Sequence, residues 1–160
     1  MRRPLDESNE VTPLSVEIRI LGPEEEAVLT HVAPGVFDHD VDPALTREFL
    51  RDARHHLAAA IEAGTVVGFA SAVHYVHPDK PAELWINEVG VAPSHQRRGL
   101  GRQLLRAIFA RGRELGCREA WVLTSEANGP AVRLYESAGG SDMADSPMMF
   151  TFRLGDETRE

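Results

Sequence analysis

The stretch Glu83–Arg113, ELWINEVGVAPSHQRRGLGRQLLRAIFARGR, decides the fold of this 160-residue chain. Its first part, in which Leu84 and Ile86 alternate with their neighbours, predicts a strand that ends at Pro93, because proline cannot continue an internal ladder. After an arginine- and glycine-rich turn, apolar residues recur every three or four positions, as on the buried face of a helix. We therefore expect a strand, a turn and a helix in that order.

The turn at residues 96–102 is suited to binding an anion. Gly99 and Gly101 have no side chains, so backbone N–H groups at the helix start can point at one ligand, and the helix dipole adds positive potential. A Walker phosphate loop would need Gly-Lys-Ser/Thr, and a dinucleotide fingerprint would need a small residue where Leu104 stands. Both are disfavoured, and the turn predicts a pyrophosphate site.

Two motifs in this order resemble the GNAT (N-acetyltransferase) superfamily. QRRGLG at 96–101 resembles the acetyl-CoA loop of that family, Gln/Arg-x-x-Gly-x-Gly/Ala, and NGPAVRLY at 128–135 resembles its Asn-x-x-Ala-x-x-Leu-Tyr segment. The resemblance implies a mixed α/β fold in which two central parallel strands splay around the pantetheine arm. It also implies acetyl-CoA as the cosubstrate.

The same resemblance assigns the cofactor contacts. Asn128 would bond the cofactor arm and Ala131 would lie against the coenzyme, while the turn would hold the pyrophosphate. The expected cofactor-binding residues are Val89, Val91, Gln96, Arg97, Arg98, Gly99, Leu100, Gly101, Arg102, Asn128 and Ala131.

Acetylation of an amine requires proton removal from the amine, stabilisation of the carbonyl oxygen and protonation of the leaving thiolate. The resemblance places Tyr135 near the thioester sulfur, where its hydroxyl could donate to a thiolate with a pKa of about 8.5. It also aims the backbone N–H of Val89 or a neighbour at the carbonyl. Glu88 interrupts an apolar strand and is the expected base, with Glu83 second and water as the alternative. A core role for Tyr135 and a solvent-facing Glu88 stay open.

The order of short sequence signals along the chain most resembles that of the aminoglycoside 3-N-acetyltransferase group. These signals are Leu21-Gly22-Pro23, the approach from Pro81 to Ile86, Glu88, His95-Gln96-Arg97, Pro130-Ala131-Val132 with Leu134-Tyr135, and Met149-Phe150. In that group acidic side chains receive a polyamine. The acceptor-binding candidates here are Asp38, Asp40, Asp42, Glu83 and Glu126, beside Glu88.

The predicted function is therefore acetyl transfer to a primary amine of a small, cationic, aminoglycoside-like molecule, by direct attack in a ternary complex. The only cysteine, Cys117, precedes its strand away from the cofactor end, so no covalent acetyl-enzyme is expected. Two alternatives stay open: an acceptor that is a peptide or protein N-terminus or a metabolite amine, and a coenzyme A-binding regulatory module without turnover.

Composition limits the other classes of function. The net charge of −8 argues against nucleic acid as the main partner, because phosphate binding favours a basic surface. No apolar run approaches a membrane span, and the N-terminal arginines lack the apolar segment of a secretory signal, so a cytoplasmic protein is expected. One cysteine excludes a multi-cysteine metal site, and no metal is expected. A homodimer is a possible assembly.

The domain organisation follows from composition and periodicity. Residues 1–14 are predicted to be a disordered tail and 156–160 a frayed C-terminus, on either side of a single domain over 15–155. The expected strands are 16–20, 57–61, 66–73, 84–91, 120–124 and 148–154, and the expected helices are 23–32, 43–50 (with Asp42 as N-cap), 100–115 and 131–138.

Overall fold

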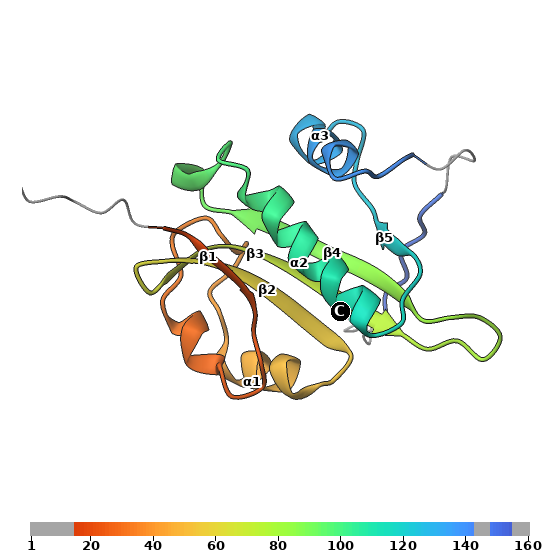
Figure 1. Cartoon of the computed structure of the whole chain (residues 1–160), viewed down its shortest axis with the longest axis horizontal. Coiled ribbons are helices and arrows are strands. Elements are labelled where there is room, and N and C mark those ends of the chain that lie inside the picture. The colour runs from red at the N-terminus through yellow and green to blue at the C-terminus, as the bar shows by residue number, and fades with distance from the viewer. Residues whose placement is uncertain (1–14, 143–147, 155–160) are drawn as a thin grey trace, which may run out of the picture.

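The computed structural model describes residues 15–142 and 148–154, which contain one five-stranded sheet of order β1-β2-β3-β4-β5 (Figure 1). The strands are β1 (Glu17–Ile20), β2 (His55–Glu62), β3 (Thr65–Tyr75), β4 (Glu83–Val91) and β5 (Ala120–Val122). The helices are η1 (Glu26–Thr30), η2 (Pro93–His95), α1 (Pro43–Arg51), α2 (Leu100–Glu114) and α3 (Gly129–Ser137). Strands β1 to β4 pair antiparallel, and β5 pairs parallel to β4. The predicted mixed α/β fold is confirmed.

Alternation along the strands separates two apolar clusters, one on each face of the sheet. On the face in front in Figure 1, α2 packs Leu104, Leu105 and Ile108 onto β2 to β4, and all three side chains are fully buried. Each contributes roughly 2 kcal/mol through the apolar area that it removes from water. On the opposite face, Phe69 and its neighbours pack under η1 and α1. The loop before α1 therefore lies on the face away from α2.

The hairpin and the helix cap form as predicted. Ala63 and Gly64 both have positive φ, 49° and 78°, as the two central residues of a tight hairpin turn require. Its arms, β2 and β3, are longer than expected because pairing continues to His55 opposite Val73. The carboxylate of Asp42 accepts from two backbone N–H groups at the start of α1, at 2.7 and 2.9 Å.

The predicted helix at 23–32 is wrong in kind and length. In this segment the structure has a short 3-10 helix, η1, over Glu26–Thr30. The reason is local: the carboxylate of Glu25 accepts from the backbone N–H of Gly22 at 2.7 Å, which stabilises a turn where the helix was expected to begin.

The predicted strand at 148–154 is also wrong. These residues form no ladder, and Met148, Phe150 and Phe152 are at least 70% exposed. Strand β5 is only three residues long, so this edge of the sheet offers too few backbone groups for a seven-residue partner. The tails predicted over 1–14 and 156–160 lie outside the described residues. Every helix over residues 15–142 and 148–154 is too short or too polar to span a bilayer.

Candidate active site

The two parallel strands separate halfway along β4. They pair only where Leu84 to Ile86 lie opposite Ala120 to Val122, and β4 then continues to Val91 without β5 beside it. This leaves backbone N–H and C=O groups of the second half of β4 unpaired on the β5 side, where a polar chain could bind them. Val89 and Val91, two of the expected cofactor residues, lie on this half-buried stretch and pack against the cluster under α2.

A β-bulge in the middle of β4 sets the direction of Glu88. Ser71 pairs with Glu88 while its neighbour Ala72 pairs with Ile86, so Asn87 is the extra residue. Simple alternation would place Glu88 on the same face as Ile86, under α2. The bulge turns Glu88 to the opposite face instead, beside Ser71.

The loop before α2 presents an uncapped helix N-terminus. Gly99, the N-cap residue, has φ 78° and no side chain that bonds the first N–H groups of the helix. These donors are free for an anion. Leu100 is buried, so only its backbone can reach a ligand. A Cβ at Gly101 would lie 3.1 Å from Leu134, so this glycine allows α3 to approach α2 closely rather than only clearing space for a ligand.

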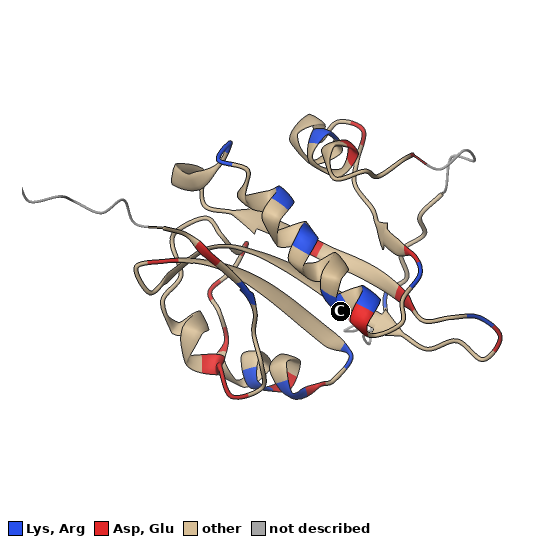
Figure 2. Ribbon diagram, viewed as in Figure 1, with Lys and Arg blue, Asp and Glu red and all other residues tan. Residues whose placement is uncertain are grey.

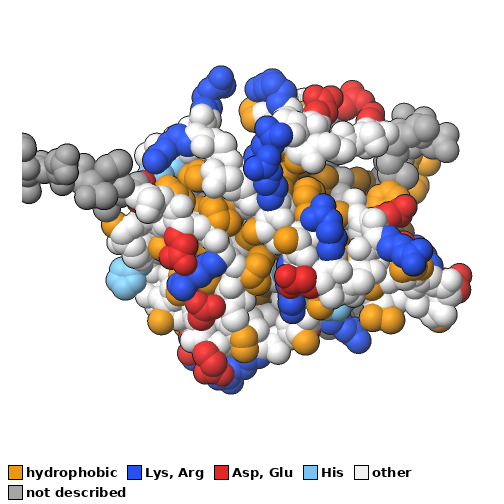
Figure 3. All heavy atoms as spheres, viewed as in Figure 1, with side chains coloured by type: hydrophobic (Ala, Val, Ile, Leu, Met, Phe, Trp, Pro, Cys, Tyr) orange, Lys and Arg blue, Asp and Glu red, His pale blue; other side chains and the backbone are white. Residues whose placement is uncertain are grey.

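Positive charge accompanies this helix start. Figure 2 shows basic residues along α2 and on the loop before it, and Figure 3 shows basic side chains standing over α2 on the same face. The arginines are Arg97 and Arg98 on the loop and Arg102, Arg106, Arg111 and Arg113 on α2. In a chain with a net charge of −8, this local excess of positive charge favours an anion at the loop.

Helix α3 carries the second motif beside α2. The side-chain oxygen of Asn128 accepts from the N–H of Ala131 at 3.3 Å and caps α3, so its amide N–H group can donate to another acceptor. Tyr135 is half-buried against the cluster under α2, and this burial raises the pKa of its phenol. The hydroxyl is therefore protonated at neutral pH and can act as a donor.

An acidic cavity of about 380 Å³ lies on the opposite face, between the loop at 37–42 and the sheet. The loop contributes Asp38, Asp40 and Asp42, and the sheet contributes Ser71, Asn87 and Glu88. The floor is apolar, because Phe37 stacks on Phe69 with ring centroids 4.0 Å apart. Three of the carboxylates predicted to bind the acceptor thus lie around the predicted base.

The surroundings of two carboxylates in this cavity, Glu88 and Asp42, change their electrostatic properties. Burial, and then the negative charge of Asp38, raise the pKa of Glu88, which moves it toward the range of a useful base. The carboxylate of Asp42 already caps α1, so the helix N-terminus offsets part of its charge. Glu88, Asp38 and Asp40 are the carboxylates most available to a cationic ligand.

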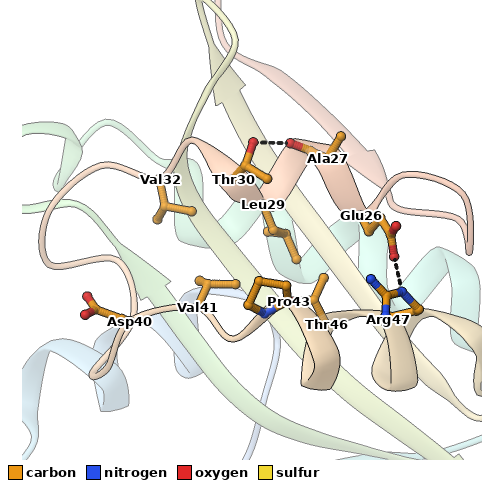
Figure 4. Close-up of a pocket in the computed structure, with 10 residues that line it drawn as sticks. All are labelled: Glu26, Ala27, Leu29, Thr30, Val32, Asp40, Val41, Pro43, Thr46 and Arg47. Carbon is orange, nitrogen blue, oxygen red and sulfur yellow. Dashed lines mark hydrogen bonds and ion pairs between the residues drawn. The ribbon is translucent and has the colours of Figure 1, made fainter.

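A second cavity of about 570 Å³ adjoins the first, between η1 and α1 (Figure 4). The two cavities share Leu29, Asp40, Val41 and Thr46 in their walls. At the far side Glu26 accepts from Arg47 at 3.1 Å. Asp40 therefore lies where the acidic cavity and the larger cavity adjoin.

Two of the predicted acceptor residues lie elsewhere. Glu83 is buried at the start of β4, where it pairs with Lys80 at 2.7 Å and accepts from the hydroxyl of Tyr75. Lys80 and then Tyr75 hold the pKa of Glu83 below its usual range, so it is poorly suited as a base. Glu126 is exposed on the loop between β5 and α3 and does not line the acidic cavity. The sequence patterns did not predict Ser71 and Asn87 as residues of the cavity, although each is a polar residue in an otherwise apolar strand.

The geometry agrees with a family assignment that extends well beyond the two motifs. The Acetyltransferase (GNAT) family profile matches residues 24–140. The chain belongs to the GNAT acetyltransferase family. The acetyltransferase fold of this family follows, as the two motifs predicted.

Two relatives show how similar this GNAT chain is in sequence to other acetyltransferases. A mycothiol acetyltransferase of Thermomonospora curvata is 38% identical over 153 residues, which cover 87% of this chain and 50% of that protein. The N-alpha-acetyltransferase RimI of Mycobacterium tuberculosis is 36% identical over 106 residues, covering 65% of this chain and 63% of that protein. The chain thus spans about half to two-thirds of the length of these relatives.

Among solved structures, an aminoglycoside acetyltransferase from an uncultured soil metagenomic sample superposes with a TM-score of 0.73 at 23% identity, covering 89% of this chain and 100% of that one. An aminoglycoside N-acetyltransferase in complex with CoA has a TM-score of 0.70 at 24% identity, covering 89% of this chain and 97% of that one. At this identity the likeness concerns the GNAT fold, which is confirmed.

Proposed function

We propose that this chain transfers the acetyl group of acetyl-CoA to a primary amine of a small, cationic, aminoglycoside-like molecule in a ternary complex. The observation that carries the proposal is the acidic cavity, in which Asp38 and Asp40 lie around Glu88 on the face to which the β4 bulge directs it. Several carboxylates above an apolar floor favour a ligand with more than one ammonium group and a carbon framework.

The cofactor would lie on the other side of β4. Its pyrophosphate would bind the N–H groups at the start of α2 with help from Arg97 and Arg102, and its pantetheine arm would lie between the separated halves of β4 and β5. The N–H of Val89 or a neighbour would then donate to the thioester carbonyl. In this arrangement the thioester would lie in the gap beside β4, where an amine held in the acidic cavity could reach it from the opposite face of the sheet.

In the proposed reaction the amine lone pair attacks the thioester carbonyl carbon, forming the C–N bond. Glu88 takes the amine proton directly or through water. Collapse of the tetrahedral intermediate breaks the C–S bond, and the phenol of Tyr135 protonates the departing sulfur. The products are the N-acetylamine and CoA.

The decisive experiment measures CoA release with a thiol reagent across aminoglycosides, spermidine, amino acids and short peptides, beside acetyl-CoA affinity by calorimetry. Fast release with an aminoglycoside or another polyamine supports the proposal. Release only with peptides would favour a peptide N-terminus as the acceptor, the alternative suggested by the relative named N-alpha-acetyltransferase. Cofactor binding without any release would point to a regulatory module.

The shared wall of the two cavities predicts a dependence on acceptor length. Asp40→Asn should raise KM about five- to tenfold for an acceptor with several ammonium groups, and by about twofold or less for a monoamine, because only the longer molecule reaches past Asp40. Steady-state kinetics with a matched pair of acceptors checks this. Asp79→Asn, on an exposed loop outside both cavities, is the control. An equal rise for both acceptors would contradict the extended site.

The raised pKa of Glu88 predicts the acidic limb of the pH profile. A base must be unprotonated, so kcat/KM should rise with pH through the raised pKa of Glu88, at a higher pH than for an ordinary glutamate. Glu88→Gln should lower kcat/KM about tenfold near neutral pH and abolish this limb. A pH profile of the variant that kept the limb would show that another group removes the proton.

A further inference from the structure

The pyrophosphate loop is tied to the end of β2 by one carboxylate. Glu62, the last residue of β2, accepts from Nε2 of His95 at 2.8 Å and from a guanidinium N–H of Arg98 at 3.3 Å. The Glu62 and His95 side chains are largely buried, with 18% and 14% of their surfaces exposed. The two donors flank the loop, one on η2 and one next to Gly99.

The loop conformation needs such support. Arg97 has φ 60°, in the left-handed region that non-glycine residues rarely adopt, and Gly99 follows with φ 78°. Residues in this region persist only where the surrounding structure holds them. The other side-chain bond from the loop in the described chain is that from Gln96 to the carbonyl of Val91, at 3.1 Å, and Gln96 is exposed.

We propose that Glu62 is a positioning residue, which holds the loop in the conformation that presents the N–H groups of α2 to the pyrophosphate. The inference rests on the proposed placement of the pyrophosphate at this loop. It extends the proposed pyrophosphate site to a residue that lies in neither motif, some thirty positions before the loop in the sequence. It also gives Arg98 a different role from the one expected: its side chain binds Glu62, and the phosphates are left to the backbone, Arg97 and Arg102.

The electrostatics of the cluster agree with this role. The hydrogen bond from His95, and then that from Arg98, hold the pKa of Glu62 below its usual range, so the group is ionised at neutral pH. Charge-assisted bonds of this kind are shorter and stronger than neutral ones. Ser94 also contacts the other ring nitrogen of His95, at 2.8 Å, which fixes the orientation of the ring.

The test compares two acetyl donors, acetyl-CoA and S-acetylpantetheine, which lacks the pyrophosphate. Glu62→Ala is expected to raise KM for acetyl-CoA about tenfold with little change in kcat, and to leave KM for S-acetylpantetheine unchanged. Glu62→Gln, which retains an acceptor oxygen, should show a smaller rise. Glu114→Ala is the matched control, because Glu114 forms an exposed ion pair with Arg111, at 3.0 Å, at the far end of α2.

Equal losses with both donors would show that Glu62 only supports the fold, and no change with either would also overturn the inference. A second variant, Gly99→Val, tests whether the pyrophosphate binds at this loop at all. Valine cannot readily adopt the left-handed conformation at the helix start, so this variant should disturb the loop directly. If Gly99→Val leaves the Kd of CoA unchanged by calorimetry, the placement itself is wrong. If Gly99→Val weakens CoA and Glu62→Ala does not, only the role of Glu62 is wrong.

Discussion

Replacing Tyr135 by phenylalanine is expected to lower kcat about 100-fold while leaving the Kd of acetyl-CoA nearly unchanged. The substitution removes the proton donor proposed for the leaving thiolate but keeps the ring that packs against the cluster under α2. Because burial raises the pKa of this phenol, it is a full donor across the neutral range. Single-turnover kinetics with saturating donor would isolate the chemical step.

Tyr75→Phe is the matched control, since Tyr75 is the other tyrosine of the chain and its hydroxyl donates to Glu83 at the opposite end of β4. It should leave kcat near the wild-type value. An unchanged kcat for Tyr135→Phe would remove Tyr135 as the acid and leave it as a core aromatic, the alternative that the sequence left open.

Replacing Gly90 by alanine is expected to lower the free energy of unfolding by roughly 2 to 4 kcal/mol. A Cβ at this position would lie 2.4 Å from the backbone carbonyl oxygen of Val36 and 2.7 Å from the ring of Phe69. Both neighbours are buried, with 3% and 1% of their surfaces exposed, so neither can move aside cheaply. Urea denaturation measures the loss.

The same clash should also weaken binding of the acceptor amine. Val36 directly precedes the loop that carries Asp38 and Asp40, so pushing its carbonyl away from β4 should also raise KM for the amine. Gly22→Ala is the control, because its Cβ would make an ordinary contact at 3.5 Å and its backbone is not left-handed. A Gly90→Ala variant as stable as the control would mean that the loop at 36 is free to shift.

The sequence predicted most of the fold because its strongest patterns are local. The helix after Gly99 and the hairpin around Gly64 both depend on periodicity and turn chemistry within a few residues. The strand predicted at 148–154 failed because a strand also needs a partner edge, and apolar composition does not reveal the length of that edge. The first helix is shorter than predicted because the carboxylate of Glu25 accepts from the N–H of Gly22, and helix propensities do not account for such a bond.

The lining of the acidic cavity could be predicted only in part, and its geometry less so. Family motifs predicted the loop before α2 and Tyr135 as site residues, and the acidic residues at 38–42 line one cavity with Glu88. The bulge at Asn87 could not be predicted, since a strict period of two directs Glu88 toward α2. Likewise, Glu83 and Glu88 look equivalent in sequence, and only the contacts with Lys80 and Tyr75 set Glu83 apart.

The short pairing between β4 and β5 has a thermodynamic consequence. Only three residue pairs join β5 to β4, and the remaining support for this part of the described chain comes from the packing of α3 against α2, so the junction relies on few backbone bonds. A pantetheine arm bonded to the free half of β4 would act as an added strand and fasten the two parts together. Binding and folding would then be linked, and the resistance of the domain to heat would depend on the cellular supply of its acetyl donor.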